Sequence, residues 1–301
     1  MAFTAKDVKE LREITGCGMM DCKKALTEAD GDMEKAQEYL REKGLAAATK
    51  KSGRIAAEGL VVSVIEGEVG VVLEVNAETD FVAKNETFVE FVNNVAKTVI
   101  KHNPADVETL LTLPCENTEM TVQEALNDRI LVIGENMKIR RFVRMEGKLA
   151  SYVHGGGKIG VMVQFDTDVA DFATVGKNVA MHIASANPSY LCREEVPAEV
   201  VEKEKEIIMA QMDNDPKMAG KPEKVKAGIV NGKIGKFYGE TCLVEQEFVM
   251  DDKKTVAQYV ADEAKAMGGT MTIAAFVRLE KGEGLEKRED NFADEVASMM
   301  K

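Results

Sequence analysis

The run His154-Gly155-Gly156-Gly157 comes closest to a catalytic motif, because an H-G-G-G sequence forms the oxyanion-hole loop of some esterases. That chemistry also needs a nucleophilic serine within a G-x-S-x-G turn, and the sequence contains no such turn. Consecutive glycines ahead of an alternating apolar run are also typical of a tight β-hairpin turn. We therefore expect a hairpin at 154–157 and no acyl-transfer site.

The other residues that could perform chemistry also form no recognisable site. His102, His154 and His182 are too far apart in the sequence to suggest a metal or catalytic cluster, although folding could place one of them at an interface. The sequence has no G-x-x-x-x-G-K-[ST] motif, and no G-x-G-x-x-G run opens a helix after a strand. The sequence therefore predicts no bound cofactor, no metal and no enzymatic active site.

One short stretch needs another explanation. E-T-D-F-V-A-K-N at 78–85 follows a run with the pattern of a buried strand and places an acid beside a large aromatic residue. In one interpretation, Asp80 caps a turn and Phe81 enters the core. In the other, the pair lies at an exposed loop tip, where Phe81 would fill a partner's pocket and Asp80 would accept its hydrogen bonds. The residue types leave both interpretations open.

The overall charge and the cysteines limit the class of protein. The 301 residues include 39 lysines and arginines against 52 aspartates and glutamates, and a net charge of -13 argues against a free-standing nucleic-acid-binding protein. The five cysteines form no C-x-x-C pair, as expected for reduced thiols in a cytosolic protein. No apolar run approaches the ~18 residues of a membrane span, and no signal segment is evident. We expect a cytoplasmic protein with no membrane partner and no direct nucleic-acid partner.

The elements that would position these residues begin with a helical unit over residues 1–45. Apolar residues at helical spacing predict three short helices, interrupted by T-G-C-G at 15–18 and A-D-G-D at 29–32. Neighbouring helix positions point about 100° apart, so at least one of Met19 and Met20 should be exposed. The pair suits either the core or an adaptable contact surface. Residues 46–58 are expected to form a flexible or partly helical linker.

An internal repeat determines the expected architecture of the remaining chain. The strand-like run at 69–76 resembles the run at 159–166, and each follows a glycine-bearing turn. The segment at 137–146 shares six of ten residues with the segment at 271–280. The first pair is 90 residues apart and the second is 134 apart, so the second half contains 44 additional residues.

Two charged helical runs at about 196–238 account for the additional residues and predict a protruding helical hairpin. Each half is then expected to be a three-stranded antiparallel sheet with helices on one face, which makes the fold class α+β. The predicted core halves are 59–149 and 150–284, and a C-terminal helix is expected at 285–301. The hairpin or the second sheet could also mediate homodimerisation through the core.

Four longer motifs resemble the translation elongation factor Ts family. They are T-D-F-V-A-K-N at 79–85, G-M-M-D-C-K-K-A-L at 18–26, I-G-E-N-M-K-I-R-R at 133–141 and S-Y-V-H-G at 151–155. The similarity runs over essentially the whole chain. It implies a UBA-like N-terminal module, a core of two subdomains and an inserted coiled-coil hairpin, in agreement with the repeat.

The resemblance also implies a function, which is guanine-nucleotide exchange on the GTPase elongation factor Tu. The segment that displaces the GTPase's Mg²⁺ in this family matches Thr79, Asp80, Phe81 and Val82. Further partner contacts by the same matching are Ile133, Gly134 and His154 on the core and Arg12, Met19, Met20 and Lys23 on the N-terminal module. The second half has D-T-D-V-A-D-F at the equivalent place and lacks the motif. The alternative function is a scaffold that binds a GTPase without affecting its nucleotide.

Overall fold

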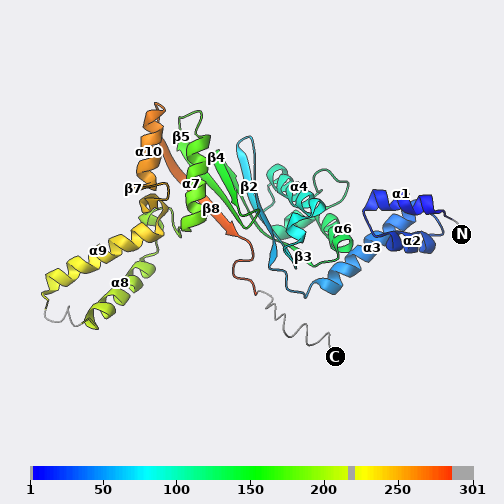
Figure 1. Cartoon of the computed structure of the whole chain (residues 1–301), viewed down its shortest axis with the longest axis horizontal. Coiled ribbons are helices and arrows are strands. Elements are labelled where there is room, and N and C mark those ends of the chain that lie inside the picture. Colours follow the sequence, from blue (N-terminus) through cyan, green and yellow to red (C-terminus); the bar gives the residue numbers. More distant parts are fainter. Residues whose placement is uncertain (1–2, 216–220, 287–301) are drawn as a thin grey trace.

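The predicted α+β class is confirmed by the computed structural model of the protein, which describes residues 3–215 and 221–286 (Figure 1). The helices of this part of the chain are α1 (Ala5–Thr15), α2 (Met19–Glu28), α3 (Met33–Lys51), α4 (Glu86–His102), α5 (Val107–Thr112), α6 (Val122–Ile133), α7 (Ala173–Ala186), α8 (Ala198–Asp213), α9 (Glu223–Thr241) and α10 (Val256–Ala266). Short 3₁₀ turns are η1 (Val82–Lys84), η2 (Arg193–Glu195) and η3 (Leu243–Glu245). The strands are β1 (Glu58–Glu66), β2 (Val69–Ala77), β3 (Met137–Glu146), β4 (Lys148–His154), β5 (Ile159–Thr167), β6 (Glu247–Phe248), β7 (Asp251–Thr255) and β8 (Met271–Glu280).

The repeated segments form equivalent strands of two antiparallel sheets. The strand orders are β1-β2-β3 and β4-β5-β8, with β2 and β5 in the centre, while β6 and β7 form a separate hairpin. The register of β2 against β3 shifts between Glu74 and Val75, and that of β5 against β8 shifts between Gln164 and Phe165. These shifts are 90 residues apart, which is the spacing of the repeated strands. The two central strands therefore share the irregularity at equivalent positions.

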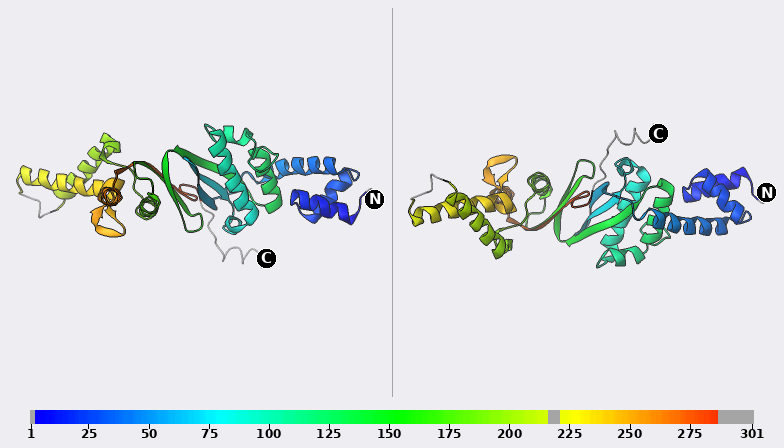
Figure 2. Two further views of the ribbon diagram at one scale, coloured as in Figure 1. Left: turned by 90° about the horizontal axis from the view of Figure 1, so that it is seen from above. Right: turned by 90° about the horizontal axis from the view of Figure 1, so that it is seen from below.

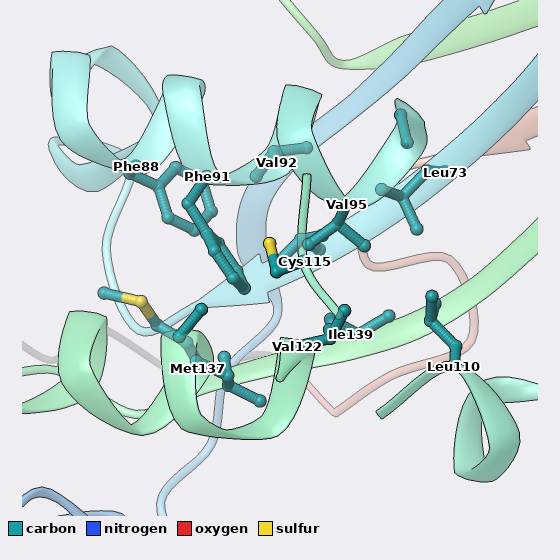
Figure 3. Close-up of a cluster of buried hydrophobic side chains, with 14 of the residues drawn as sticks. Leu73, Phe88, Phe91, Val92, Val95, Leu110, Cys115, Val122, Met137 and Ile139 are labelled. Atoms are coloured by element: carbon teal, nitrogen blue, oxygen red, sulfur yellow. The ribbon is translucent and has the colours of Figure 1, made fainter. Parts of the chain in front are cut away.

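The two sheets pack face to face, and helices cover their outer faces. Val61 and Val72 of the first sheet meet Met162 and Leu279 of the second in a buried cluster between the sheets. On the other face of β2, α4 packs through an apolar stripe, which Figure 3 shows around Phe91. The buried residues labelled there include Phe88, Val92 and Val95 of α4, Leu73 of β2 and Ile139 of β3. On the outer face of the second sheet, α7 and α10 occupy the corresponding place.

The N-terminal helices α1, α2 and α3 enclose a small core of their own, which includes Leu11, Leu26 and Leu40. The third helix continues through Gly44 as far as Lys51, so the first half of the linker that was expected to be flexible or partly helical is helical. Gly44 allows this: a Cβ there would lie 3.3 Å from the backbone oxygen of Asn127 on α6. The continued helix therefore packs closely on α6.

The predicted hairpin is formed by α8 and α9, which pack through Ile208, Met212 and Ile234. Figure 2 shows the hairpin and the three-helix module at opposite ends of the long axis, with the sheets between them. The helix predicted at 285–301 lies outside the described residues except for its first two positions.

Candidate functional site

The loop between β2 and α4 exposes the aromatic residue that the sequence singled out. Phe81 is 79% exposed, Asp80 is also exposed, and the next residue, Val82, is buried at 4%. Asn85, and not Asp80, is the N-cap of α4, since its side chain accepts hydrogen bonds from two amides of the first turn. The interpretation that places Phe81 in the core is therefore wrong, because Val82 and Asn85 take the buried and capping roles.

A reciprocal pair of carboxylates, which we call the loop brace, holds this loop against the connection between α6 and β3. The Glu78 side chain accepts a hydrogen bond from the backbone N–H of Asn136 at 2.6 Å. In return, Glu135 accepts one from the N–H of Thr79 at 2.9 Å and another from its hydroxyl at 2.7 Å. Hydrogen bonds to ionised carboxylates are stronger than neutral ones, so the brace fixes the start of the Phe81 loop.

The sequence analysis missed Glu78, Glu135 and Asn136, although all three lie within motifs that it quoted. Arg54 extends the brace to the chain that follows α3. Its guanidinium lies 3.3 Å from Glu78, and its carbonyl oxygen accepts a hydrogen bond from the Asn136 side chain at 2.8 Å. The only sequence signal was the occurrence of acidic residues beside the predicted contact positions.

The predicted contact residues Ile133 and Gly134 lie directly beside this brace. Gly134 ends α6 in the left-handed conformation, with φ of 87°, and its N–H bonds to the carbonyl of Ile130 at 3.0 Å. Gly134 is exposed, while Ile133 packs partly against the core of the first sheet. Burial, and secondly Arg54, lowers the pKa of nearby Lys51, whose amino group lies 3.5 Å from the same carbonyl. The structure thus brings Thr79 and Gly134 together through Glu135.

The predicted contact residues of the N-terminal module lie on a separate surface. Arg12 lies on α1, and Met19, Met20 and Lys23 lie on the first turns of α2. All four are exposed, and both methionines are prominently so, at 54% and 73%. Neither methionine belongs to the module's core. The pair therefore offers an adaptable apolar contact flanked by cationic side chains.

His154 lies on a third surface, at the end of β4 in the second sheet. Its Nδ1 is 3.1 Å from the hydroxyl of Tyr152. Both residues border a hollow of about 370 Å³ that is also lined by Val249 and Met250. These two apolar residues are 55% and 50% exposed, and the sequence analysis missed them. Their signal was an adjacent apolar pair at the tip of the β6–β7 hairpin.

The possible metal ligands and the cysteine thiols are the groups that remain to be placed. Within 3–215 and 221–286, no group of three or more histidines, cysteines or acids could hold a metal ion. Burial raises the pKa of the Cys17 thiol to about 11, so it is a poor nucleophile. In the same part of the chain, no helix has the length and apolar character needed to cross a membrane.

Comparison with known proteins assigns the chain to a family. The sequence profile of the family described as Elongation factor TS matches residues 78–283, which include the Phe81 loop, the loop brace, strand β3 of the first sheet and all three strands of the second sheet. A protein named elongation factor Ts from Syntrophotalea carbinolica is 54% identical over 307 residues, covering 100% of both chains. A second protein named elongation factor Ts, from Trichlorobacter lovleyi, is 51% identical over 99% of this chain and 98% of the relative's chain. One from Clostridium botulinum is 51% identical over 99% of each chain. The chain therefore belongs to the elongation factor Ts family.

Proposed function

We propose that this protein binds the GTPase elongation factor Tu in the cytoplasm and accelerates release of its GDP during translation elongation. The observation that carries the proposal is the exposure of Phe81, 79%, on a loop that is fixed by the loop brace on one side and by buried Val82 on the other. An exposed aromatic side chain on a fixed loop is suited to enter a preformed pocket. Membership of the elongation factor Ts family supports the choice of partner.

The proposed mechanism is displacement of the groups that hold the nucleotide. A GTPase binds its nucleotide partly through Mg²⁺ and through backbone amides around the phosphates. Phe81 would enter near that site, and the carboxylate of Asp80 would compete for the same amides and cations. Because binding is reciprocal, a factor that weakens nucleotide binding is itself weakened by the nucleotide to the same extent.

A large acceleration of GDP release requires more than one contact with the GTPase. Each tenfold acceleration of release needs about 1.4 kcal/mol of preferential stabilisation of the transition state for release. Burying one large apolar side chain contributes about 1.5–3 kcal/mol, so Phe81 could supply only part of a large acceleration. The remaining stabilisation would come from the Met19–Met20 surface and from the surface around His154, Val249 and Met250, each of which exposes apolar side chains.

In this proposal the protein has no bond-making site of its own, and the GTPase supplies the bound nucleotide. The alternative is a scaffold that binds the same GTPase without changing its nucleotide affinity. Both require the exposed surfaces, but they differ in the role of Phe81. For an exchange factor, Phe81 acts on the release step, whereas for a scaffold it contributes only to affinity.

The test is stopped-flow release of fluorescent GDP from elongation factor Tu over a range of factor concentrations. The parent protein is compared with Phe81→Ala and with Met267→Ala, a control that truncates an apolar side chain, 41% exposed, in the second half of the chain. We expect rapid release with the parent and with the control. With Phe81→Ala we expect a saturated rate that is lower by about tenfold, the equivalent of about 1.4 kcal/mol.

Other outcomes would identify a different function or mechanism. If the parent at saturation leaves GDP release at its spontaneous rate, the exchange function is wrong and the scaffold is favoured. If Phe81→Ala reaches the same saturated rate at a higher concentration, the exchange function stands but Phe81 contributes only binding energy. Circular dichroism melting verifies that each variant is folded.

A further inference from the structure

We infer that Glu135 is a positioning residue, which orients the Phe81 loop for nucleotide release by holding Thr79. This inference rests on the proposed exchange function. Glu135 receives both donors of one residue, the N–H of Thr79 at 2.9 Å and its hydroxyl at 2.7 Å. A carboxylate that takes the backbone and the side chain of the same residue fixes both its position and its rotamer.

The second half of the chain provides an internal comparison for this contact. The strand repeat places Asp168 at the position of Glu78, and the closing-strand repeat places Thr270 at the position of Asn136. Asp168 accepts a hydrogen bond from the N–H of Thr270 at 2.6 Å, just as Glu78 does from Asn136. One half of the loop brace is therefore common to both repeats and serves to join the two loops.

The other half of the brace occurs only beside Phe81. The positions equivalent to Glu135 and Thr79 are Gly269 and Val169, which cannot form the corresponding bonds. A Cβ at Gly269 would lie 2.4 Å from a carboxylate oxygen of Asp168 and 2.8 Å from a methyl of Val169, so no side chain fits there. The preceding glycines, Gly134 and Gly268, share the left-handed conformation, with φ of 87° and 80°.

The second half of the chain shows whether Glu135 is needed to form the two loops or to orient Phe81. The second half forms the same pair of loops without a carboxylate at the position of Glu135, so this carboxylate is not needed to build them. The first half differs in carrying an exposed aromatic residue two positions after Thr79. Phe81 makes too little contact with its own protein to be oriented by packing, since it is 79% exposed. Its orientation then depends on its neighbours, Val82 on one side and Thr79, held by Glu135, on the other.

Loss of Glu135 should therefore affect the release step more than binding. A loosened loop still presents Phe81 to the partner, but it samples the productive orientation less often, and rate depends steeply on orientation. We expect Glu135→Ala to lower the saturated rate of GDP release by about tenfold. The factor concentration that gives half of this rate should change by less than about twofold. Glu135→Gln retains one acceptor oxygen and should give an intermediate rate.

Substitutions of Thr79 test the same contact from the other side. Thr79→Ser keeps both donors and should match the parent. Thr79→Val removes the hydroxyl and should lower the saturated rate. The double variant Thr79→Val with Glu135→Ala should release GDP no more slowly than Glu135→Ala alone, because both changes disrupt the same interaction, that between Thr79 and Glu135. The control is Glu108→Gln, which removes an exposed carboxylate on α5.

A second readout reports the loop without the partner. The sequence contains no tryptophan, so Phe81→Trp introduces a single tryptophan at the loop tip, which can be excited apart from the five tyrosines. Adding Glu135→Ala should lower the fluorescence anisotropy of this tryptophan, whereas adding Glu108→Gln should leave it unchanged. A role limited to overall stability would lower the melting temperature but would not increase the mobility of Trp at position 81 in the folded protein.

The outcomes separate this inference from the proposed function. If the parent accelerates release and Glu135→Ala equals it in saturated rate, the positioning role is wrong while the exchange function stands. A shift of half-saturation alone would make Glu135 a binding contact and also overturn the inference. If the parent itself fails to accelerate release, the exchange function is wrong. In that case unchanged anisotropy would show that Glu135 does not hold the loop either.

Discussion

Gly70 and Gly160 occupy equivalent positions in the central strands β2 and β5, and each faces the opposite sheet at a point where a side chain has no room. A Cβ at Gly160 would lie 2.5 Å from a methyl of Val61, and one at Gly70 would lie 2.5 Å from the sulfur of Met162. The repeat therefore places a glycine at two equivalent points where the sheets pack closely. Close packing of this kind leaves little tolerance for added volume.

The neighbours of the two glycines differ in stiffness, which predicts unequal effects of substitution. Gly160→Ala meets the β-branched Val61 and Val72, whose side chains have few alternative rotamers. We expect it to lower the free energy of unfolding by about 1–3 kcal/mol. Gly70→Ala meets the flexible ends of Met162 and Leu149 and should cost less. Urea denaturation of both variants measures the difference, and an equal or larger loss for Gly70→Ala would contradict it.

The central strands of both sheets could be predicted because apolar residues recur with a two-residue period at 69–76 and 159–166, and the closing strands could be predicted because one repeats the other. The segments 137–146 and 271–280 coincide with β3 and β8. The pairing of the two sheets could not be predicted, because alternation identifies buried positions without identifying their partner. Val72 and Leu73 are both fully buried, one against the other sheet and one against α4.

The candidate site was predictable only in part, for a similar reason. Periodicity cannot decide which of Phe81 and Val82 is buried in a short irregular loop. The hydrogen bonds of the loop brace join residues that are separated by 56 and 58 positions in the sequence, and contacts at such separations leave no local sequence pattern. The sequence left open how far α3 extends beyond Gly44, because glycine is a common helix terminator, whereas here it permits close packing on α6.

Glu74 is a buried carboxylate that alternation did not reveal, and its removal should be costly. It is completely buried on β2 and accepts hydrogen bonds from Arg140 at 3.0 Å, from Arg141 at 2.6 Å and from the N–H of Gly282 at 2.7 Å. Glu74→Ala would leave two arginines without this acceptor. We expect the free energy of unfolding to fall by about 3–5 kcal/mol, measured by urea denaturation.

The equivalent residue of the second sheet provides the control for this prediction. Gln164 is neutral and half-buried, and its amide donates to the carbonyl of Glu146 at 2.9 Å. Gln164→Ala should cost only about 1 kcal/mol. Comparable losses for Glu74→Ala and Gln164→Ala would show that the ion pairs of Glu74 add no stability beyond that of a neutral hydrogen bond.

Glu74 also predicts a loss of stability in acid. Burial by itself raises the pKa of Glu74, but the N–H of Gly282, Asn76 and the two arginines outweigh burial and hold the pKa below its usual value. A carboxyl group with a lowered pKa in the folded state contributes stability above its unfolded pKa of about 4.3 and loses it as the pH falls. Unfolding free energies of Glu74→Gln should therefore fall less steeply below about pH 4.5 than those of the parent.

The glycines of α9 predict that the helical hairpin can be stabilised by simple substitution. Gly228, Gly232 and Gly235 lie within this helix, and a Cβ at any of them would meet no atom within 4 Å. Replacement of each by alanine should raise helix stability by about 0.5–1 kcal/mol, because glycine loses more backbone entropy on folding. Slower hydrogen exchange of α9 amides measures the effect. Gly176→Ala on α7 is the matched control and should destabilise, since its Cβ would lie 2.4 Å from that of Ala150.

His182 links the stability of the second half to pH near neutrality. Its Nδ1 accepts a hydrogen bond from the N–H of Val249 at 3.2 Å, so the ring proton lies on Nε2, which donates to Gln246 at 2.9 Å. Burial lowers the pKa of His182, and the bond to Gln246 only partly offsets this effect. The neutral ring thus fixes Val249, which lines the same hollow as His154.

The lowered pKa means that the unfolded chain takes up a proton at His182 before the folded protein does. The contribution to stability is therefore complete above the unfolded pKa of about 6.5 and is lost as the pH falls through the lower folded value. His182→Gln cannot titrate, so its unfolding free energy should decline less than that of the parent between about pH 7 and pH 5. His102→Gln on α4 is exposed and serves as the control. Parallel pH profiles for the parent and His182→Gln would show that His182 is not the titrating group.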